Sequence, residues 1–224
     1  MSGGVDSSTA AWLLKEKGHE VIGATMCIGT PDRNETGSNR CCGFSDMEDA
    51  RRIALQLEIP FYVFQFKEEF EKEVIDYFCK EYREGRTPNP CILCNEKLKF
   101  GSFLKRAMEL GADYVATGHY ARLEFDEESG QYLLKKGIDR KKDQSYVLFS
   151  LRQDQLRHTL FPLGEFKKEE VRKMAFETGL RVHDKPESQE VCFIPEASYH
   201  HFLSERLKEA ITAGPILDRE GNVL

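Results

Sequence analysis

Apolar residues follow two different spacings along the first 120 residues. They recur every three or four positions, as on one face of a helix, over residues 10–14, 50–57, 67–84 and 97–110. Short, nearly continuous apolar runs at 20–26, 61–66 and 113–120 are typical of buried strands. This alternation predicts an α/β fold, a doubly wound and mostly parallel sheet with helices on both faces.

Beyond residue 120 the pattern changes. Apolar runs at 123–125 and 132–134 flank the turn Glu128-Ser129-Gly130, which predicts a hairpin. Helical spacing resumes at 145–156, 167–178 and 199–210. The last residues, AGPILDREGNVL, predict two short strands about a turn.

Ligands of parallel sheets bind at the carboxyl ends of the strands. The loops expected there are 1–8, 27–44, 87–95 and 117–122. Pro88 and Pro90 predict that the third loop has no regular structure. The unusual residues of the chain, its Gly-Ser turn and most of its cysteines, fall in these loops.

The first loop, MSGGVDSS, has the features of a phosphate site. Gly3 and Gly4 carry no Cβ, so their backbone N–H groups can come close to an anion, and the following helix directs its positive end to the same place. Hydroxyl donors are supplied by Ser2, Ser7, Ser8 and Thr9. No lysine follows Gly4 before Lys15, which excludes the Walker A pattern. Asp6 either caps the helix or organises the phosphates and Mg²⁺.

Composition narrows the protein class. The hydrophobic content of 40% suffices for a core, and neither a signal peptide nor a membrane-length apolar run is present in the sequence, so we expect a cytoplasmic protein without a membrane partner. A net charge of -6 argues against nonspecific nucleic-acid binding. One local segment carries five cations and a single acidic residue, Asp139. This segment is either a solvated hairpin face or an RNA contact, and its cations are Lys135, Lys136, Arg140, Lys141 and Lys142.

Seven cysteines in a chain with no secretory signal favour thiol chemistry or metal binding over structural disulfides. Cys91 and Cys94 form a Cys-x-x-Cys pair, which zinc sites, redox disulfides and iron–sulfur clusters all use. A second such pair, common in zinc sites, is missing, and Cys41-Cys42 are adjacent, a poor geometry for chelating one metal. Lys97 or Lys99 would favour the thiolate form of a nearby cysteine.

Longer strings carry a family resemblance. SGGVDSS resembles the PP-loop of ATP pyrophosphatases, and RTPNPCILCNEKLKF resembles the catalytic loop of the tRNA-specific 2-thiouridylases, a PP-loop subfamily. Further matching strings follow in order: CCGFSDMEDARRIALQLEIPFYV, ATGHYAR, KDQSYVLF and ESQEVCFI. The resemblance spans nearly the whole chain and implies ATP-dependent thiolation of the wobble uridine of tRNA to 2-thiouridine.

The resemblance also implies roles for the matching residues. The ATP phosphates would be held by Ser2, Gly3, Gly4, Val5, Asp6, Ser7 and Ser8. The adenine and ribose would be bordered by Met26 and Gly118, and the target base by Asn89, Pro90 and Cys91. The tRNA would be contacted by Lys142, Asp143 and Gln144. Cys94 would be the nucleophile and Cys192 would carry a persulfide.

At Cys91 the chain departs from its family, where many members carry Asp. Two sulfur carriers are therefore open. Cys91, Cys94 and Cys192 could hold a 4Fe–4S cluster with one open iron, or Cys94 and Cys192 could run a persulfide and disulfide cycle. The implied cofactors are ATP and Mg²⁺, and the implied partners are a tRNA anticodon loop and a sulfur donor such as a cysteine desulfurase or a persulfide relay protein.

Two other functions stay open: a PP-loop synthetase that adenylates a small molecule, and a Cys-x-x-Cys protein that senses metal or redox state. By resemblance, residues 1–206 form the catalytic domain and residues 207–224 begin a central β domain. The short strand that precedes the PP-loop in the family has no counterpart here. We therefore expect a fragment without the first strand of its sheet, less stable and less active than the complete protein.

Overall fold

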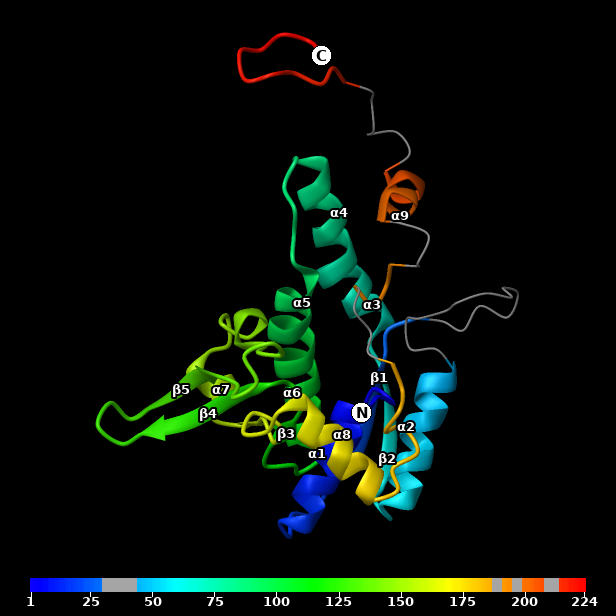
Figure 1. The fold of residues 1–224 in the computed structure, drawn as a ribbon, viewed down its shortest axis with the longest axis vertical. Coiled ribbons are helices and arrows are strands. Elements are labelled where there is room, and N and C mark those ends of the chain that lie inside the picture. Colours follow the sequence, from blue (N-terminus) through cyan, green and yellow to red (C-terminus); the bar gives the residue numbers. More distant parts are fainter. Residues whose placement is uncertain (30–43, 187–190, 195–198, 208–213) are drawn as a thin grey trace.

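The computed structural model describes residues 1–29, 44–186, 191–194, 199–207 and 214–224 (Figure 1). Cys41 and Cys42 lie outside the described residues. None of the described helices is long and apolar enough to cross a membrane.

The first half of the chain alternates helices with parallel strands, as predicted. After α1 (Val5–Glu16), β1 (Gly23–Cys27) pairs in parallel with β2 (Phe61–Gln65), and α2 (Phe44–Gln56) connects them. The backbone of Met1 contacts the same strand, since Thr25 Oγ1 donates to the Met1 carbonyl at 2.6 Å. Apolar side chains of α1 and α2, among them Val5 and Ile53, pack together in one core cluster.

Two helical rods follow, and each contains a π-helical stretch. The first is α3 (Lys67–Phe70), η1 (Glu71–Ile75) and α4 (Asp76–Arg83). The second is α5 (Pro90–Leu93), η2 (Cys94–Ser102) and α6 (Phe103–Glu109). The prediction that 87–95 has no regular structure is wrong from Pro90 onward, because a proline at the first helical position loses no hydrogen bond and is already set to helical φ.

The second half of the chain contains two further strand pairs. β3 (Val115–Ala116) pairs in parallel with β6 (Thr159–Leu160), a strand that the pattern did not predict. The predicted hairpin is confirmed and extended as β4 (Ala121–Asp126) and β5 (Gln131–Lys136). The α/β class is thus confirmed, although the described strands pair in three two-stranded sheets.

The helices of the second half differ from the prediction in one place. The expected helix over 145–156 is wrong: the structure has a 3₁₀ turn, η3 (Ser145–Val147), and a separate short helix, α7 (Gln153–Leu156). The predicted helix at 167–178 is confirmed as α8 (Lys168–Glu177), and α9 (Tyr199–Arg206) starts where expected. An isolated antiparallel bridge joins Leu217 to Val223 in the tail. The domain boundary at residue 206 stays a prediction.

Candidate active site

The glycines of the opening loop let it turn tightly into α1. Gly3 has φ +67°, and a Cβ there would lie 2.2 Å from the Asp46 carbonyl oxygen, so a side chain is excluded. Gly4 is the extended N-cap residue, and no side chain caps the helix. The first N–H groups of a helix lack intrahelical partners. The positive end of α1 is therefore available to an anion.

The hydroxyls of this loop divide into two sets. Ser8 Oγ donates to the Gly4 carbonyl at 2.9 Å and Thr9 Oγ1 donates to the Val5 carbonyl at 2.9 Å, both buried inside the helix. Ser2 is exposed, and its backbone N–H donates to Ser7 Oγ at 3.1 Å. Ser2 and Ser7 are thus the more accessible hydroxyls of the predicted phosphate site.

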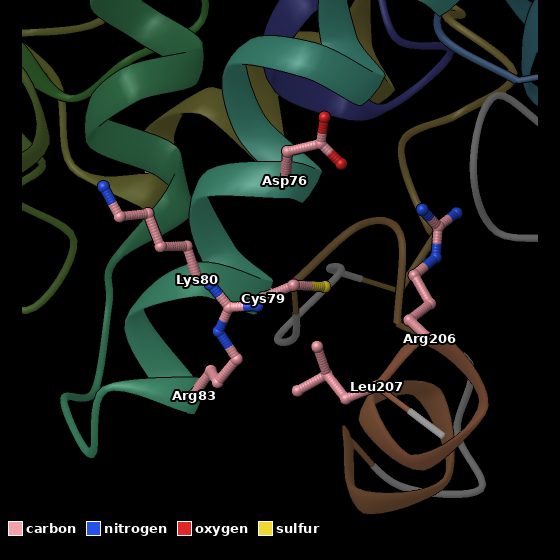
Figure 2. Close-up of a pocket in the computed structure, with 6 residues that line it drawn as sticks. All are labelled: Asp76, Cys79, Lys80, Arg83, Arg206 and Leu207. Atoms are coloured by element: carbon pink, nitrogen blue, oxygen red, sulfur yellow. The ribbon is translucent and has the colours of Figure 1, made fainter. Parts of the chain in front are cut away.

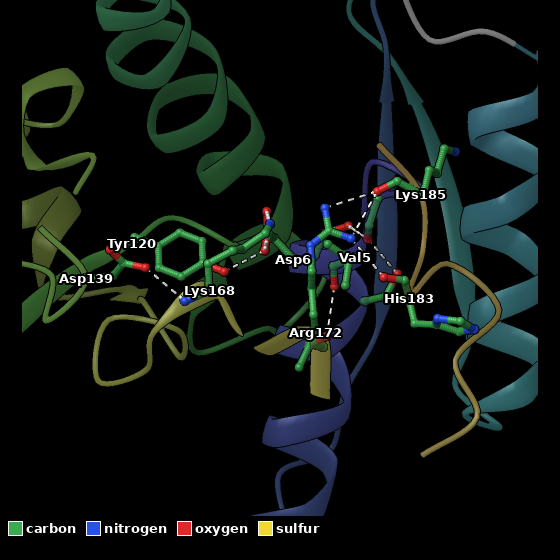
Figure 3. Close-up of polar contacts among 12 residues, drawn as sticks. Val5, Asp6, Tyr120, Asp139, Lys168, Arg172, His183 and Lys185 are labelled. Carbon is green, nitrogen blue, oxygen red and sulfur yellow. Dashed lines mark hydrogen bonds and ion pairs between the residues drawn. The ribbon is translucent and has the colours of Figure 1, made fainter. Parts of the chain in front are cut away.

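Asp6 is held by two residues from distant parts of the chain. Lys168 Nζ lies 2.7 Å from both carboxylate oxygens, and the Tyr120 hydroxyl donates to Oδ1 at 2.8 Å (Figure 3). Gly4, rather than Asp6, is the N-cap residue of α1. The helix-cap interpretation of Asp6 is therefore wrong, and its carboxylate instead ties the first turn of α1 to α8.

A second lysine that the sequence did not single out contacts the other side of the loop. Lys185 Nζ donates to the Gly3 carbonyl at 3.0 Å, to Asp46 Oδ1 at 2.7 Å and to Asp49 Oδ2 at 2.7 Å. Burial lowers the pKa of Lys185, but its hydrogen bonds to Asp46 and Asp49, together with their negative charges, outweigh this effect and raise the pKa overall. No local sequence signal marks Lys185 or Lys168, because their partners lie more than a hundred residues away.

Gly118 packs directly on the opening loop. A Cβ at this position would lie 2.9 Å from the Asp6 backbone carbon and 2.9 Å from the Ser7 nitrogen, so only glycine fits without displacing the loop. The structure therefore brings Gly118 together with the predicted phosphate residues. Met26, by contrast, is half-buried near the end of β1 and packs against the core cluster of α3 and α4.

Cys91 and Cys94 are placed by a well-defined helix start. Asn89 Oδ1 accepts from the Cys91 N–H at 3.1 Å and so caps α5, whose first residue is Pro90. Cys91 is exposed, and the half-buried Cys94 begins the π-helical stretch η2. π-Helical turns occur frequently at functional sites.

A buried glutamine stabilises the π-helical stretch. Gln155 is 3% exposed, and its Nε2 donates to the carbonyls of Glu96 at 3.0 Å and Phe100 at 2.8 Å. Its Oε1 accepts from the Arg152 N–H at 2.9 Å, so both ends of the amide are used. Gln155 thereby satisfies carbonyls of the helix that carries Cys94.

Cys192 reaches the same region from the other end of the chain. It is exposed, whereas the next two residues, Phe193 and Ile194, are buried in the core against α3 and α4. Protein atoms around the two sulfur atoms displace water and raise the pKa of both Cys91 and Cys94; the nearby Lys99 ammonium lowers it in part, and the proximity of Cys192 raises it further. The three predicted cysteines therefore share one electrostatic neighbourhood.

Metal binding by these cysteines finds no geometric support in the part of the chain that the structure describes. Among those residues no group of three or more His, Cys, Asp or Glu side chains is arranged to hold a metal ion. The 4Fe–4S interpretation of Cys91, Cys94 and Cys192 thus stays a sequence-based prediction.

His119 lies between the opening loop and η2, the helical stretch that begins at Cys94. It follows Gly118, and its ring centroid is 6.2 Å from that of Phe100 on η2. Thr117 Oγ1 is 2.7 Å from His119 Nδ1. Burial, and to a lesser extent the charge of Lys99, hold the pKa of His119 well below its ordinary value, so the ring is neutral at pH 7.

The predicted tRNA-contact residues lie in the turn that precedes η3. Asp143 Oδ1 accepts from the Gly137 N–H at 2.9 Å, and Asp143 Oδ2 accepts from the Ser145 hydroxyl at 2.9 Å. Gln144 Oε1 accepts from the Tyr120 N–H at 3.1 Å. The side chains of Asp143 and Gln144 thus hold this turn in place, beside the half-buried Lys142.

A separate pocket lies between α4 and α9 (Figure 2). Its lining consists of Asp76, Cys79, Lys80, Arg83, Arg206 and Leu207. None of the predicted site residues lines it. Burial raises the pKa of Cys79, as expected for a cysteine that serves as a small apolar residue.

Comparisons with known proteins agree with the motifs. The sequence model of the family described as tRNA methyl transferase HUP domain matches residues 1–196. Over its full length the chain is 52% identical to the tRNA-specific 2-thiouridylase MnmA of Clostridioides difficile (strain 630) and 54% identical to the proteins of that name from Moorella thermoacetica and Carboxydothermus hydrogenoformans. It spans 62 to 63% of the length of these relatives.

Proposed function

Because the chain belongs to the tRNA methyl transferase HUP domain family, we propose that it catalyses the ATP-dependent conversion of a tRNA wobble uridine to 2-thiouridine. The name of its relatives, tRNA-specific 2-thiouridylase, supports this reaction. The observation that carries the proposal is the position of residues 117–120, which contact both parts of the candidate site. Gly118 packs on the phosphate loop, while His119 packs on the helix that carries Cys94.

ATP binds with its phosphates at the N-terminus of α1, where Ser2 and Ser7 offer accessible hydroxyls. The uridine O2 attacks the α-phosphate and pyrophosphate leaves, which activates the C2 carbon because AMP is a good leaving group. Magnesium accompanies ATP and neutralises polyphosphate charge. Asp6 does not fit as its protein ligand in this structure, because both carboxylate oxygens accept hydrogen bonds from Lys168. The positive charge near the opening loop instead comes from lysine side chains and from the N-terminus of α1.

Sulfur transfer in the proposed reaction uses the two thiols predicted for it. The terminal sulfur of a Cys192 persulfide attacks C2 and AMP departs. The Cys94 thiolate then attacks the Cys192 sulfur, which leaves a Cys94–Cys192 disulfide and releases 2-thiouridine. An external thiol reductant regenerates both cysteines. The sulfur donor is a persulfide-carrying protein such as a cysteine desulfurase, and the reaction takes place in the cytoplasm.

Thiolation of unmodified tRNA by the protein with ATP and a sulfur source tests this proposal. We expect AMP and pyrophosphate to appear only when tRNA is present, and we expect Cys94→Ser and Cys192→Ser to abolish 2-thiouridine. Cys79→Ser is the matched control, because that thiol lies in the separate pocket of Figure 2 and should leave product formation intact. Release of ADP, or nucleotide turnover that ignores tRNA, would contradict the proposal.

The same assay separates the two sulfur carriers. Full activity of Cys91→Ser in a protein that contains no iron after anaerobic purification supports the persulfide cycle. Loss of activity together with loss of bound iron supports the 4Fe–4S cluster on Cys91, Cys94 and Cys192.

A further inference from the structure

Two aromatic side chains beside the candidate site face solvent. Tyr146 is 62% exposed and Phe149 is 68% exposed, whereas the residues between them, Val147 and Leu148, are 5% and 0% exposed. Successive i to i+3 hydrogen bonds hold this segment, from Val147 to Gln144 and from Leu151 to Leu148. A turn anchored in the core thus carries two large rings on its outside. Such exposed apolar groups mark interaction surfaces when they occur together.

Hydrogen bonds connect this turn to both halves of the candidate site. Asn95, which follows Cys94 and is 1% exposed, donates from Nδ2 to the Val147 carbonyl at 3.0 Å. On the other side, the Gln144 N–H donates to the Tyr120 carbonyl at 2.9 Å, and the hydroxyl of Tyr120 reaches Asp6. The position of the two rings is therefore fixed relative to the thiols and to the phosphate loop.

The chain just before these rings is cationic, although the protein as a whole is acidic. Arg140 and Lys141 are exposed. The carboxylate of Asp139, the one acidic residue within 137–142, accepts from the backbone N–H groups of Lys141 and Lys168, both at 3.0 Å. Aromatic rings next to cations are the arrangement that binds unpaired nucleotides, since the rings stack on bases and the cations attract phosphates. Two rings are too small an area for a stable protein partner, which typically covers about 800 Å² per side.

We propose that Tyr146 and Phe149 stack on unpaired bases of the RNA substrate next to the nucleotide that enters the site. This inference rests on the proposed function and adds to it the residues that hold the loop open around the target base. An extruded base leaves its former neighbours without a stacking partner. The two rings supply that partner at a fixed place beside Cys94.

The test measures binding of an anticodon stem-loop RNA, with 2-aminopurine at each unpaired position in turn, by anisotropy and by quenching. We expect Tyr146→Ala and Phe149→Ala each to weaken binding by about 10-fold and to relieve the quenching at one position. Tyr146→Phe and Phe149→Tyr should restore both. The matched control is Phe176→Ala, which removes a 66% exposed ring from α8 and should behave as the unaltered protein. A fully paired duplex should show no dependence on either ring.

The possible outcomes separate this inference from the proposed function. If the alanine variants bind and quench like the unaltered protein while tRNA thiolation proceeds, the stacking surface is refuted and the proposed function stands. If the rings affect stem-loop binding but no thiolation occurs, the stacking surface stands and the reaction falls. If the alanine variants instead change a dimer into a monomer on sedimentation, the surface joins copies of the chain and the inference is overturned.

Discussion

Lys168 places its ammonium nitrogen 2.7 Å from both carboxylate oxygens of Asp6, although 162 positions separate the two residues. The lysine side chain is 8% exposed and the aspartate side chain 33%. The same nitrogen lies 5.6 Å from the ring centroid of Tyr120, whose hydroxyl also donates to Asp6. This contact fastens α8 to the loop that we assign to ATP.

Lys168→Met should lower the free energy of unfolding by about 1.5–3 kcal/mol, because it removes two charge-assisted hydrogen bonds from a partly buried carboxylate. Urea denaturation measures the loss. Lys173→Met on the same helix is the control, since Lys173 forms only an exposed pair with Glu177 at 3.7 Å and should change stability by less than about 1 kcal/mol. Equal effects of the two substitutions would contradict a special role for the Lys168–Asp6 contact.

The thiol of Cys94 should react with iodoacetamide along a pH curve shifted above that of an ordinary thiol. Burial raises its pKa, and only the thiolate reacts, so alkylation is slow at neutral pH and increases as pH rises. Lys99→Met should shift the curve to still higher pH, because the Lys99 ammonium favours the thiolate. Peptide mass spectrometry follows Cys94 separately from the other cysteines.

Lys97→Met provides the comparison for this experiment. Lys97 is two residues closer in sequence to Cys94 than Lys99 is, but its ammonium pairs with Glu96 at 2.8 Å. The Lys97→Met substitution should therefore leave the alkylation curve of Cys94 unchanged. An identical shift in the two variants would show that general surface charge, rather than Lys99, controls the thiol.

Phe193→Ala should impair formation of the Cys94–Cys192 disulfide. The Phe193 ring is 7% exposed and packs edge to face on Phe70 and Phe78, with centroid distances of 5.6 and 5.3 Å. Truncation of such a buried ring costs about 3–5 kcal/mol and removes the anchor next to Cys192. The fraction of linked thiols after mild oxidation, measured by mass spectrometry, reports the effect.

Phe193→Leu keeps an apolar anchor and should retain most of the disulfide. This milder variant separates anchoring from global unfolding, which circular dichroism monitors in both proteins. Disulfide formation at the original rate in a folded Phe193→Ala protein would show that Cys192 does not depend on this anchor.

Acidification should destabilise the protein in part through His119. The folded state keeps this ring neutral because burial holds its pKa well below the ordinary value of about 6.5, whereas the unfolded chain binds a proton near that pH. Its stabilising contribution is therefore complete above pH 7.5 and decreases as pH falls through 6.5. Urea midpoints between pH 7.5 and 5.5 measure the decrease.

His119→Gln should make that decrease smaller, since the variant has no proton to gain at this position. His19→Gln, at an exposed histidine, should leave the pH dependence as it was. If His119→Gln shows the full decrease, other groups cause the acid sensitivity.

Local pattern sufficed for much of the fold. The helices at 167–178 and 199 onward, the hairpin and the parallel β1–β2 pair were predicted because each depends on periodicity or turn residues within a short window. The helix over 145–156 failed because Val147, Leu148 and Leu151 have helical spacing and are buried, but the chain turns between them. The Asp143 carboxylate accepts a hydrogen bond from the Ser145 hydroxyl, which favours a turn there.

The candidate site shows the same division. The Gly-Ser loop and the cysteines stand out as residue types, and the structure brings Gly118 to the loop. Lys168, Lys185 and Gln155 could not be found from sequence, because their chemistry lies in contacts made across 55 to 182 positions. The π-helical stretch at Cys94 was equally hidden, since Gln155 supplies the contacts that support it from another element.

The buried position of Phe193 limits how far the neighbouring residue, Cys192, can move. Adjacent Cα atoms are held about 3.8 Å apart by a trans peptide, so the Cα of Cys192 is confined to a shell of that radius around the Cα of Phe193. Rotation about two backbone bonds and the side chain is all the freedom that remains while the ring stays in the core. In the reaction that we propose, the tRNA base is therefore brought to within a few ångströms of the Cys192 sulfur, and most of the movement is made by the RNA.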